Sequence, residues 1–304
     1  MVYANFFNDT ITLRVALQMD ATPILKKFDD FVDRMDYYQV HKEARDSLGP
    51  AVKAIKDIYE RTNPRKAGQD PGYYTVNSKL SSLPVRYQSN TFELRTLYDI
   101  VGWILSVVGP VPSIAKRDNY YYPLMMIGYV FCAKLIPTQA VEKNGKKQKP
   151  SAGPPEVWSV MWFKDEQQVA RVVVGANLDQ PGKIPKNNAK DFRKSLLDTS
   201  HILGWDTKQP SIMQQLSARG TGQDFGHCAE TYPLLFICSL SHAQNIAGLA
   251  KVKKPPLFKR VSKDWLLKPH FYMIKSTPEY CSTRRPRDDE VYYEEAEDDE
   301  VYLS

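Results

Sequence analysis

Hydrophobic residues recur every three to four positions along two stretches near the start of the chain, which is the spacing of one face of an α-helix. The first stretch follows Thr22-Pro23, where a threonine cap and a proline in the first turn favour a helix start. The second stretch follows Gly49-Pro50. Two amphipathic helices are therefore predicted, with apolar faces formed by Ile24, Leu25, Phe28, Phe31, Val32 and Met35, and by Val52, Ile55, Ile58 and Tyr59.

A third helix is predicted to begin at Asn90, with Glu93 three positions later as the partner in a capping box. A fourth apolar run covers residues 120–136. Asp99 and Lys134 interrupt these two runs, and neither run reaches the ~20 clean apolar residues that a membrane span needs. We therefore expect the buried helices of a bundle and no membrane-spanning segment.

Two polar stretches separate the predicted elements. Residues 63–90 are rich in Pro, Gly, Ser and Asn and are predicted to be a loop. Residues 138–155 combine four lysines with Asn144-Gly145 and several prolines, a composition typical of a flexible basic linker. The linker divides the chain after a helical region that covers residues 1–137.

After the linker, β-branched and aromatic residues become frequent. The runs at 157–163 and 169–174 predict two strands of a hairpin, because a short polar segment separates them. A helix is expected near 189–203, and a strand is expected at 270–275 after a basic loop. Residues 156–287 are therefore predicted to form a domain that contains both α and β structure.

Composition excludes several classes of protein. The chain has 304 residues, of which 42% are hydrophobic and 25% charged, so it is not disordered along its whole length. Four cysteines exclude a disulfide scaffold and indicate a reducing compartment. The N-terminal sequence has no basic start followed by an apolar core, so we expect an intracellular protein, cytoplasmic or nuclear.

Charge is distributed unevenly along the chain. Residues 288–304 hold nine acidic residues and no basic one, and they repeat Asp-Asp-Glu-Val-Tyr twice. Residues 1–287 carry 41 basic and 26 acidic residues, a net charge of +15. A basic body with an acidic tail is typical of proteins that bind or mimic a polyanion. The tail has too few apolar residues to build a core and is predicted to be disordered.

One short segment, Gly226–Glu230, carries most of the candidate chemistry. It places Cys228 and Glu230 two positions apart, immediately before an apolar run that resembles a helix. The dipole of a helix favours a thiolate at its N-terminus. If that thiolate bound zinc, Glu230 would lie close to a water that the metal acidifies and would move its proton, as hydrolytic deamination requires.

At this segment the chain resembles the zinc-dependent nucleoside and nucleic-acid deaminase superfamily. The hallmark of that family is His or Cys, any residue, then Glu at the start of one helix, and Pro-Cys-x-x-Cys at the start of the next. Cys228-Ala229-Glu230 matches the first half, and hairpin, motif helix, strand and second ligand follow in the family's order. The resemblance implies a three-layer domain with a mixed sheet over residues 156–287, acting on a base in a nucleotide or nucleic acid. It also implies a zinc ion held by Cys228 and Cys281, with Glu230 as the proton shuttle. His227 is our predicted third ligand, although it does not stand at the family's spacing.

The second half of the motif departs from the family's pattern. Pro278 lies three positions before Cys281 rather than directly before it. Arg284 stands where the last cysteine belongs, and a cation cannot bind zinc. The side chains that remain as a further ligand are His227, Cys238 and His242.

Two other functions remain open from the sequence. One is a thiol hydrolase that uses Cys228 as its nucleophile. Its base would be His201, His242 or His270, because adjacent helical side chains such as His227 and Cys228 point apart. The other is a non-catalytic binding or interaction protein on a degenerate deaminase fold, which Arg284 favours. The oligomeric state is not predicted.

Other side chains are predicted to be structural. His41 lies in a charged segment and is predicted to be at the surface. Cys132 lies in an apolar run and is predicted to pack in the core, as are Trp158 and Trp162.

Overall fold

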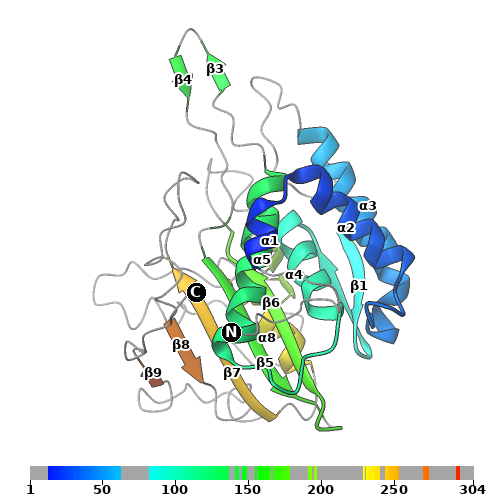
Figure 1. The fold of residues 1–304 in the computed structure, drawn as a ribbon, viewed down its shortest axis with the longest axis vertical. Helices are drawn as coiled ribbons and strands as arrows, with labels where there is room; N and C mark the ends of the chain where they lie inside the picture. The colour runs from blue at the N-terminus through cyan, green and yellow to red at the C-terminus, as the bar shows by residue number, and fades with distance from the viewer. Residues whose placement is uncertain are drawn as a thin grey trace.

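The computed structural model has a mixed α and β architecture (Figure 1). It describes residues 13–62, 82–136, 141–143, 146–148, 155, 157–165, 167–178, 191–193, 195–196, 229, 231–239, 244–252, 270–273 and 292–294. The helices are α1 (Leu13–Gln18), α2 (Ala21–Asp33), α3 (Arg45–Thr62), α4 (Leu97–Val107), α5 (Tyr122–Leu135) and α8 (Thr231–Cys238), with short turns η1 (Lys42–Ala44) and η3 (Arg117–Tyr121). The strands are β1 (Leu83–Tyr87), β2 (Asn90–Leu94), β3 (Val141–Lys143), β4 (Lys146–Gln148), β5 (Val157–Lys164), β6 (Ala170–Ala176), β7 (Gln244–Val252), β8 (His270–Met273) and β9 (Tyr292–Glu294).

Five strands form one sheet in the order β6-β5-β7-β8-β9, and β1–β2 and β3–β4 form two smaller sheets. Every described pair of neighbouring strands is antiparallel. The prediction of mixed α and β structure is therefore confirmed. The mixed sheet implied by the resemblance is not seen among the described strands, and the short connection between β5 and β6 allows antiparallel pairing alone.

The hairpin predicted at 157–174 is confirmed as β5 and β6, and Asp165 organises its turn. The carboxylate of Asp165 accepts hydrogen bonds from the backbone N–H groups of Gln167 and Val169 at 3.0 and 2.8 Å. It also accepts one from Nε of Arg171 at 2.8 Å. A buried carboxylate is stable here because these donors replace the water that it loses.

Helices lie on both faces of the five-stranded sheet. A Cβ at Gly128 of α5 would lie 2.6 Å from Trp158, so α5 packs closely on the face of β5 that carries this side chain. Pro233 of α8 lies against Gly175 of β6. Gly175 pairs with Ser159, the neighbour of Trp158 along β5. Because side chains alternate along a strand, α5 and α8 cover opposite faces.

Helix α4 lies along the outer edge of β6 and pairs with its backbone. Oγ of Ser106 accepts a hydrogen bond from the Val174 N–H at 2.9 Å and donates one to the carbonyl of Gly102 at 2.7 Å. A Cβ at Gly102 would lie 2.6 Å from the carbonyl oxygen of Val174. Glycine and serine one turn apart thus allow the helix to cover an edge that would otherwise expose unpaired backbone groups.

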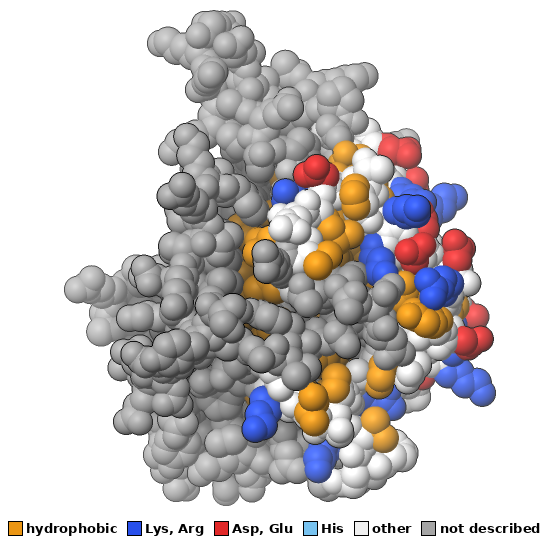
Figure 2. Space-filling model, viewed as in Figure 1, with side chains coloured by type: hydrophobic (Ala, Val, Ile, Leu, Met, Phe, Trp, Pro, Cys, Tyr) orange, Lys and Arg blue, Asp and Glu red, His pale blue; other side chains and the backbone are white. Residues whose placement is uncertain are grey.

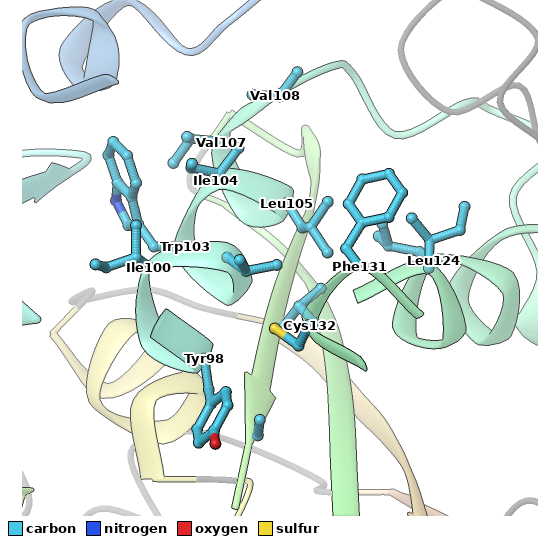
Figure 3. Close-up of a cluster of buried hydrophobic side chains, with 14 of the residues drawn as sticks. Tyr98, Ile100, Trp103, Ile104, Leu105, Val107, Val108, Leu124, Phe131 and Cys132 are labelled. Atoms are coloured by element: carbon cyan, nitrogen blue, oxygen red, sulfur yellow. The ribbon is translucent and has the colours of Figure 1, made fainter. Parts of the chain in front are cut away.

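The helices of the first half and the sheet share one continuous hydrophobic core. Figure 3 shows one part of it, where Leu105 of α4 faces Phe131 and Leu124 of α5, and Trp103 lies on the opposite side of α4. Cys132 is fully buried among these side chains, as predicted, and Trp158 is also buried. The boundary predicted at 138–155 therefore separates two stretches of sequence whose described residues pack around the same core.

The third helix begins later than the sequence predicted. Residues 90–94 form β2, which pairs with β1 in the stretch predicted to be a loop, and α4 begins at Leu97. Oγ1 of Thr96 accepts a hydrogen bond from the Asp99 N–H, and the Asp99 carboxylate accepts one from the Thr96 N–H. The capping box expected at Asn90 and Glu93 is instead formed by Thr96 and Asp99, at the start of α4.

Three further regions contain strands that the sequence did not predict. β3 and β4 form a hairpin in the expected linker, and this hairpin extends away from the rest of the described chain (Figure 1). β7 lies in the region expected to be a basic loop, and β9 lies in the tail expected to be disordered. Each of these strands pairs with a neighbouring strand, and the local composition does not indicate which segment that neighbour is.

No helix in the described part of the chain combines the length and the apolar character needed to cross a bilayer. This agrees with the expectation that the two apolar runs of the first half are buried helices.

The close approach of α4 to β6 can be tested by replacing Gly102 with alanine. Gly102→Ala is expected to lower the free energy of unfolding by about 1–3 kcal/mol, because the new Cβ would overlap the Val174 carbonyl. The control is Gly49→Ala in α3, where the nearest atom would be 4.0 Å away and no loss is expected. Urea unfolding measures both. Equal effects of the two substitutions would show that α4 does not lie this close to β6.

Candidate functional site

The four predicted site residues, Cys228, Glu230, Cys281 and His227, lie outside the described residues, as do Arg284 and His242. The structure does describe Ala229, between Cys228 and Glu230, and the helix that follows. The apolar run after this segment is helical, as predicted, because α8 begins at Thr231. Pro233 is the third residue of α8, a position whose N–H would have no partner within the helix.

The start of α8 is seated on Gly175 of β6. The carbonyl oxygen of Ala229 and the ring of Pro233 would both overlap a Cβ at this position, with Cδ of Pro233 at 2.5 Å. Ala229 itself is 1% exposed. Any residue other than glycine at 175 would push the helix away from the sheet. The chain between Cys228 and Glu230 is therefore held against β6.

A row of small residues crosses the sheet beside this contact. Gly175 is opposite Ser159 of β5, and Ser159 is opposite Ala250 of β7. The row continues to His270 of β8. The hydroxyl of Ser159 is buried and has no hydrogen-bond partner in the described part of the chain. Of the three histidines suggested as the base of a thiol hydrolase, only His270 is among the described residues. Its backbone lies three strand spacings, roughly 14 Å, from Gly175.

The sheet topology allows Cys281 to reach the start of α8. β8 ends at Met273, which is opposite Ala247 of β7, three positions along the strands from the row of Gly175. Three strand spacings and three residues of rise correspond to roughly 17 Å across the sheet. The eight residues from Met273 to Cys281 span at most about 27 Å when extended.

The order of elements, however, differs from the family pattern implied by the sequence. In that pattern the second ligand follows the first strand after the motif helix. Here β7 and then β8 follow α8, and residues 253–269 between them contain no cysteine or histidine. Cys281 therefore follows the second of the strands that the structure describes after α8. Its assignment as a ligand depends on the distance that the chain can span and not on the order of the elements.

Among the described residues, no group of three or more His, Cys, Asp or Glu side chains is placed to hold a metal. Cys132 is described and is fully buried in the core. Burial, reinforced by the nearby Asp99 charge, raises the pKa of its thiol well above the ordinary value. Cys132 therefore acts as a packing residue, and the predicted metal ligands all belong to the segments around α8 and after β8.

A cluster of charged groups that the sequence did not predict surrounds His41. The imidazole is 11% exposed, so the prediction that His41 lies at the surface is wrong. Nη1 of Arg171 lies 3.3 Å from its Nε2, and Oε1 of Glu43 lies 3.9 Å from its Nδ1. Since a guanidinium can donate but not accept, Nε2 is the acceptor. Burial and the Arg171 charge lower the pKa of His41 to about 4, so the ring is neutral at pH 7.

Tyr87 connects this cluster to α8. Its ring stacks on Phe236 of α8, with centroids 4.9 Å apart. Its hydroxyl is buried without a hydrogen-bond partner in the described part of the chain, and burial raises the pKa of the phenol above its usual range. The cluster joins η1, β1 and the β5–β6 hairpin, whose residues are up to 130 positions apart, so no local sequence pattern could have indicated it.

A second buried network links α4, β6 and α8 through Arg193. Nη2 of Arg193 forms an ion pair with Asp99 and donates to the Ala176 carbonyl at 3.1 Å. The guanidinium carbon lies 5.3 Å from the centroid of the Tyr232 ring. The Tyr232 hydroxyl donates to the Glu93 carbonyl at 2.7 Å. Residues 191–193 and 195–196 are helical, in agreement with the helix expected near 189–203.

Comparison with known proteins gives no relative from which a function could be transferred. No protein-family model matches the chain, and no curated protein or solved structure matches it. The functional argument therefore depends on the residues and contacts described above.

The neutral state of His41 predicts a pH dependence of stability. Between pH 6.5 and about 4 the unfolded chain binds a proton at His41 that the folded chain does not, so stability falls as the pH is lowered. The expected loss is about 3 kcal/mol and is complete near pH 4. His41→Gln should remove this part of the pH dependence. Identical pH profiles of urea unfolding for the two proteins would contradict the buried neutral ring.

The Asp99–Arg193 pair predicts a large effect of neutralising one partner. Asp99→Asn keeps an oxygen for the Thr96 N–H but leaves Arg193 buried without its counter-charge, so a loss of about 3–5 kcal/mol is expected. The matched control is Asp29→Asn, whose partner Lys56 is 38% exposed, and a change below about 1 kcal/mol is expected there. Equal, small effects of both substitutions in urea unfolding would show that the Arg193 pair is not buried.

Proposed function

We propose that this chain is a deaminase-like hydrolase that removes the amino group of a base in a nucleotide or nucleic acid. Cys228 is the proposed first zinc ligand, Cys281 and His227 are proposed to complete the site, and Glu230 is proposed to carry the proton. The observation that supports this most directly is the contact between the start of α8 and Gly175 of β6.

That contact gives the Cys-x-Glu segment the local setting that the proposed chemistry needs. Ala229 is buried against the sheet, and Cys228 and Glu230 each lie one peptide unit, about 3.8 Å, from its Cα. Glu230 directly precedes the first turn of α8, where the helix dipole favours negative charge. In this proposal the thiolate of Cys228 and the carboxylate of Glu230 would flank the buried Ala229 at the start of a helix that packs on the sheet.

The overall reaction would be hydrolysis, in which water replaces the amino group of the base and ammonia leaves. A bound zinc ion would supply the acidity that makes water a nucleophile near pH 7. Glu230 would accept a proton from that water and deliver it to the departing amine. The same carboxylate would therefore act first as a base and then as an acid, while Cys228 stays deprotonated.

A non-catalytic binding protein on a related fold is the second candidate. Two observations favour it. β7 and a stretch without cysteine or histidine intervene between α8 and β8, and Arg284 replaces the last cysteine of the family motif. In that case Cys228 and Glu230 would be structural residues at the start of α8.

Metal content distinguishes the two candidates. The deaminase proposal predicts about one tightly bound zinc ion per chain and its loss in Cys228→Ser and Cys281→Ser. Cys132→Ala is the matched control, because Cys132 is buried in the core, and it should retain zinc. Glu230→Gln should keep the metal and lower turnover by about 10²–10⁴-fold. Absence of zinc from the unmodified chain, or its retention in Cys228→Ser, would exclude the proposal and favour the binding protein.

A further inference from the structure

A buried hydroxyl without a hydrogen-bond partner lies beside the candidate site. Ser159 of β5 is fully buried, and its Oγ has no hydrogen-bond partner among the residues that the structure describes. Such an atom has lost its contact with water and gained no protein contact in exchange, which is unusual in a folded protein. In ligand pockets, a few buried polar groups of this kind fix the orientation of a ligand whose other contacts are apolar.

Ser159 faces the side of the sheet that carries α8. The neighbouring Trp158 lies against Gly128 of α5, and side chains alternate along a strand, so Ser159 points to the other face. Gly175 of β6 is opposite Ser159, and the start of α8 packs against this glycine. The Ser159 hydroxyl therefore projects from the sheet next to the start of α8.

Ser159 and the start of α8 are close enough to contact one small molecule. In an antiparallel pair, the Cβ positions of opposite residues are about 4.5–5.5 Å apart. The Cβ position at Gly175 is in direct contact with the carbonyl oxygen of Ala229 and lies 2.5 Å from Cδ of Pro233. The Cβ of Ser159 is therefore within about 8 Å of both atoms. A small molecule bound to the Ser159 hydroxyl would border the segment that contains Ala229.

The residues around Ser159 on this face of the sheet are small or apolar. Gly175 is beside it on β6, and Gly248 of β7 is opposite Met161, two residues further along β5 and thus on the same face. Gly248 is buried, as are the apolar side chains of Met161 and Val173. The face thus combines small and apolar residues with the Ser159 hydroxyl, which is the composition of a pocket for an uncharged ring.

Charge on the surface of the first helices does not indicate a ligand of either sign. Residues 13–62 hold nine acidic and nine basic residues, and these side chains are interspersed over the surface that they form (Figure 2). A site for a strongly charged ligand would gather one sign of charge. The small and apolar surroundings of Ser159 instead favour a ligand that binds through an uncharged planar ring.

We propose that the Ser159 hydroxyl forms a hydrogen bond with the nucleobase of a bound ligand and holds the ring beside the start of α8. The choice of a nucleobase rests on the proposed function, because Cys228 and Glu230 are proposed to act on a base. The hydrogen bond itself does not require zinc, since Ser159 belongs to the sheet. A serine hydroxyl can donate or accept, so its role here is to position the ring.

The test replaces each of two buried serines with alanine. Ser106 is the matched control for Ser159, because it is 1% exposed but its Oγ makes two hydrogen bonds, with the Val174 N–H and the Gly102 carbonyl. Cytidine, uridine, adenosine and guanosine are titrated by calorimetry into full-length chains that carry Glu230→Gln, so that no ligand is consumed. Ribose serves as the ligand that lacks a base. Urea unfolding of each chain is measured without ligand.

Ser159→Ala should weaken the binding of the tightest nucleoside by about tenfold, because one hydrogen bond to the base is lost. The same substitution should leave the urea midpoint unchanged or raise it, since the hydroxyl has no partner among the described residues when no ligand is bound. Ser106→Ala should lower the urea midpoint and leave the affinity for the nucleoside unchanged.

The role of Ser159 would be overturned if no nucleoside binds, if ribose binds equally well, or if Ser159→Ala leaves the affinity unchanged. It would also be overturned if Ser159→Ala lowers the urea midpoint as Ser106→Ala does, because the hydroxyl would then be part of the fold. Zinc content separates this inference from the proposed function. A chain without zinc whose nucleoside affinity depends on Ser159 would exclude zinc-dependent deamination and retain the inference. A chain with zinc whose affinity is insensitive to Ser159→Ala would do the reverse.

Discussion

The packing of α4 along the edge of β6 is the interaction on which the other contacts of the described structure depend. Asp99, Gly102 and Ser106 lie on one face of α4, three and four residues apart. Ser106 pairs with the Val174 N–H, Gly102 admits the Val174 carbonyl, and Asp99 holds Arg193 where it donates to Ala176. One helix face thus satisfies the exposed backbone of an edge strand and joins the first half of the chain to the sheet.

Strand β6 also carries Gly175, on which the start of α8 is seated. Gly175, which contacts the start of α8, lies between Val174 and Ala176. Val174 is hydrogen-bonded to Ser106 of α4, and Ala176 accepts a hydrogen bond from Arg193. Tyr232 of α8 in turn lies beside Arg193 and donates to the Glu93 carbonyl. The start of α8 is therefore positioned by both the sheet and the helical half, which gives a physical role to the N-terminal helices in any chemistry at Cys228 and Glu230.

Local patterns in the sequence predicted the β5–β6 hairpin, the helix after Glu230 and the first two amphipathic helices, because each depends on spacing within a few residues. Asn144-Gly145 is a strong hairpin signal between short strands, but the lysines and prolines around it are equally typical of a linker. The environment of His41 could not be predicted in this way, because its partner Arg171 is 130 positions away. β7 and β9 likewise depend on neighbours that composition does not specify, and the predicted zinc ligands lie outside the described residues.

The proposed function requires that the segment seated on Gly175 forms a zinc site with Cys228 and a second thiolate. X-ray absorption at the zinc edge tests it most directly, because sulfur ligands at about 2.3 Å are distinguishable from nitrogen and oxygen at about 2.0–2.2 Å. Two sulfur ligands are expected in the purified chain, and one is expected in Cys228→Ser with zinc added back. A spectrum with nitrogen and oxygen ligands alone, or a spectrum that Cys228→Ser leaves unchanged, would contradict it.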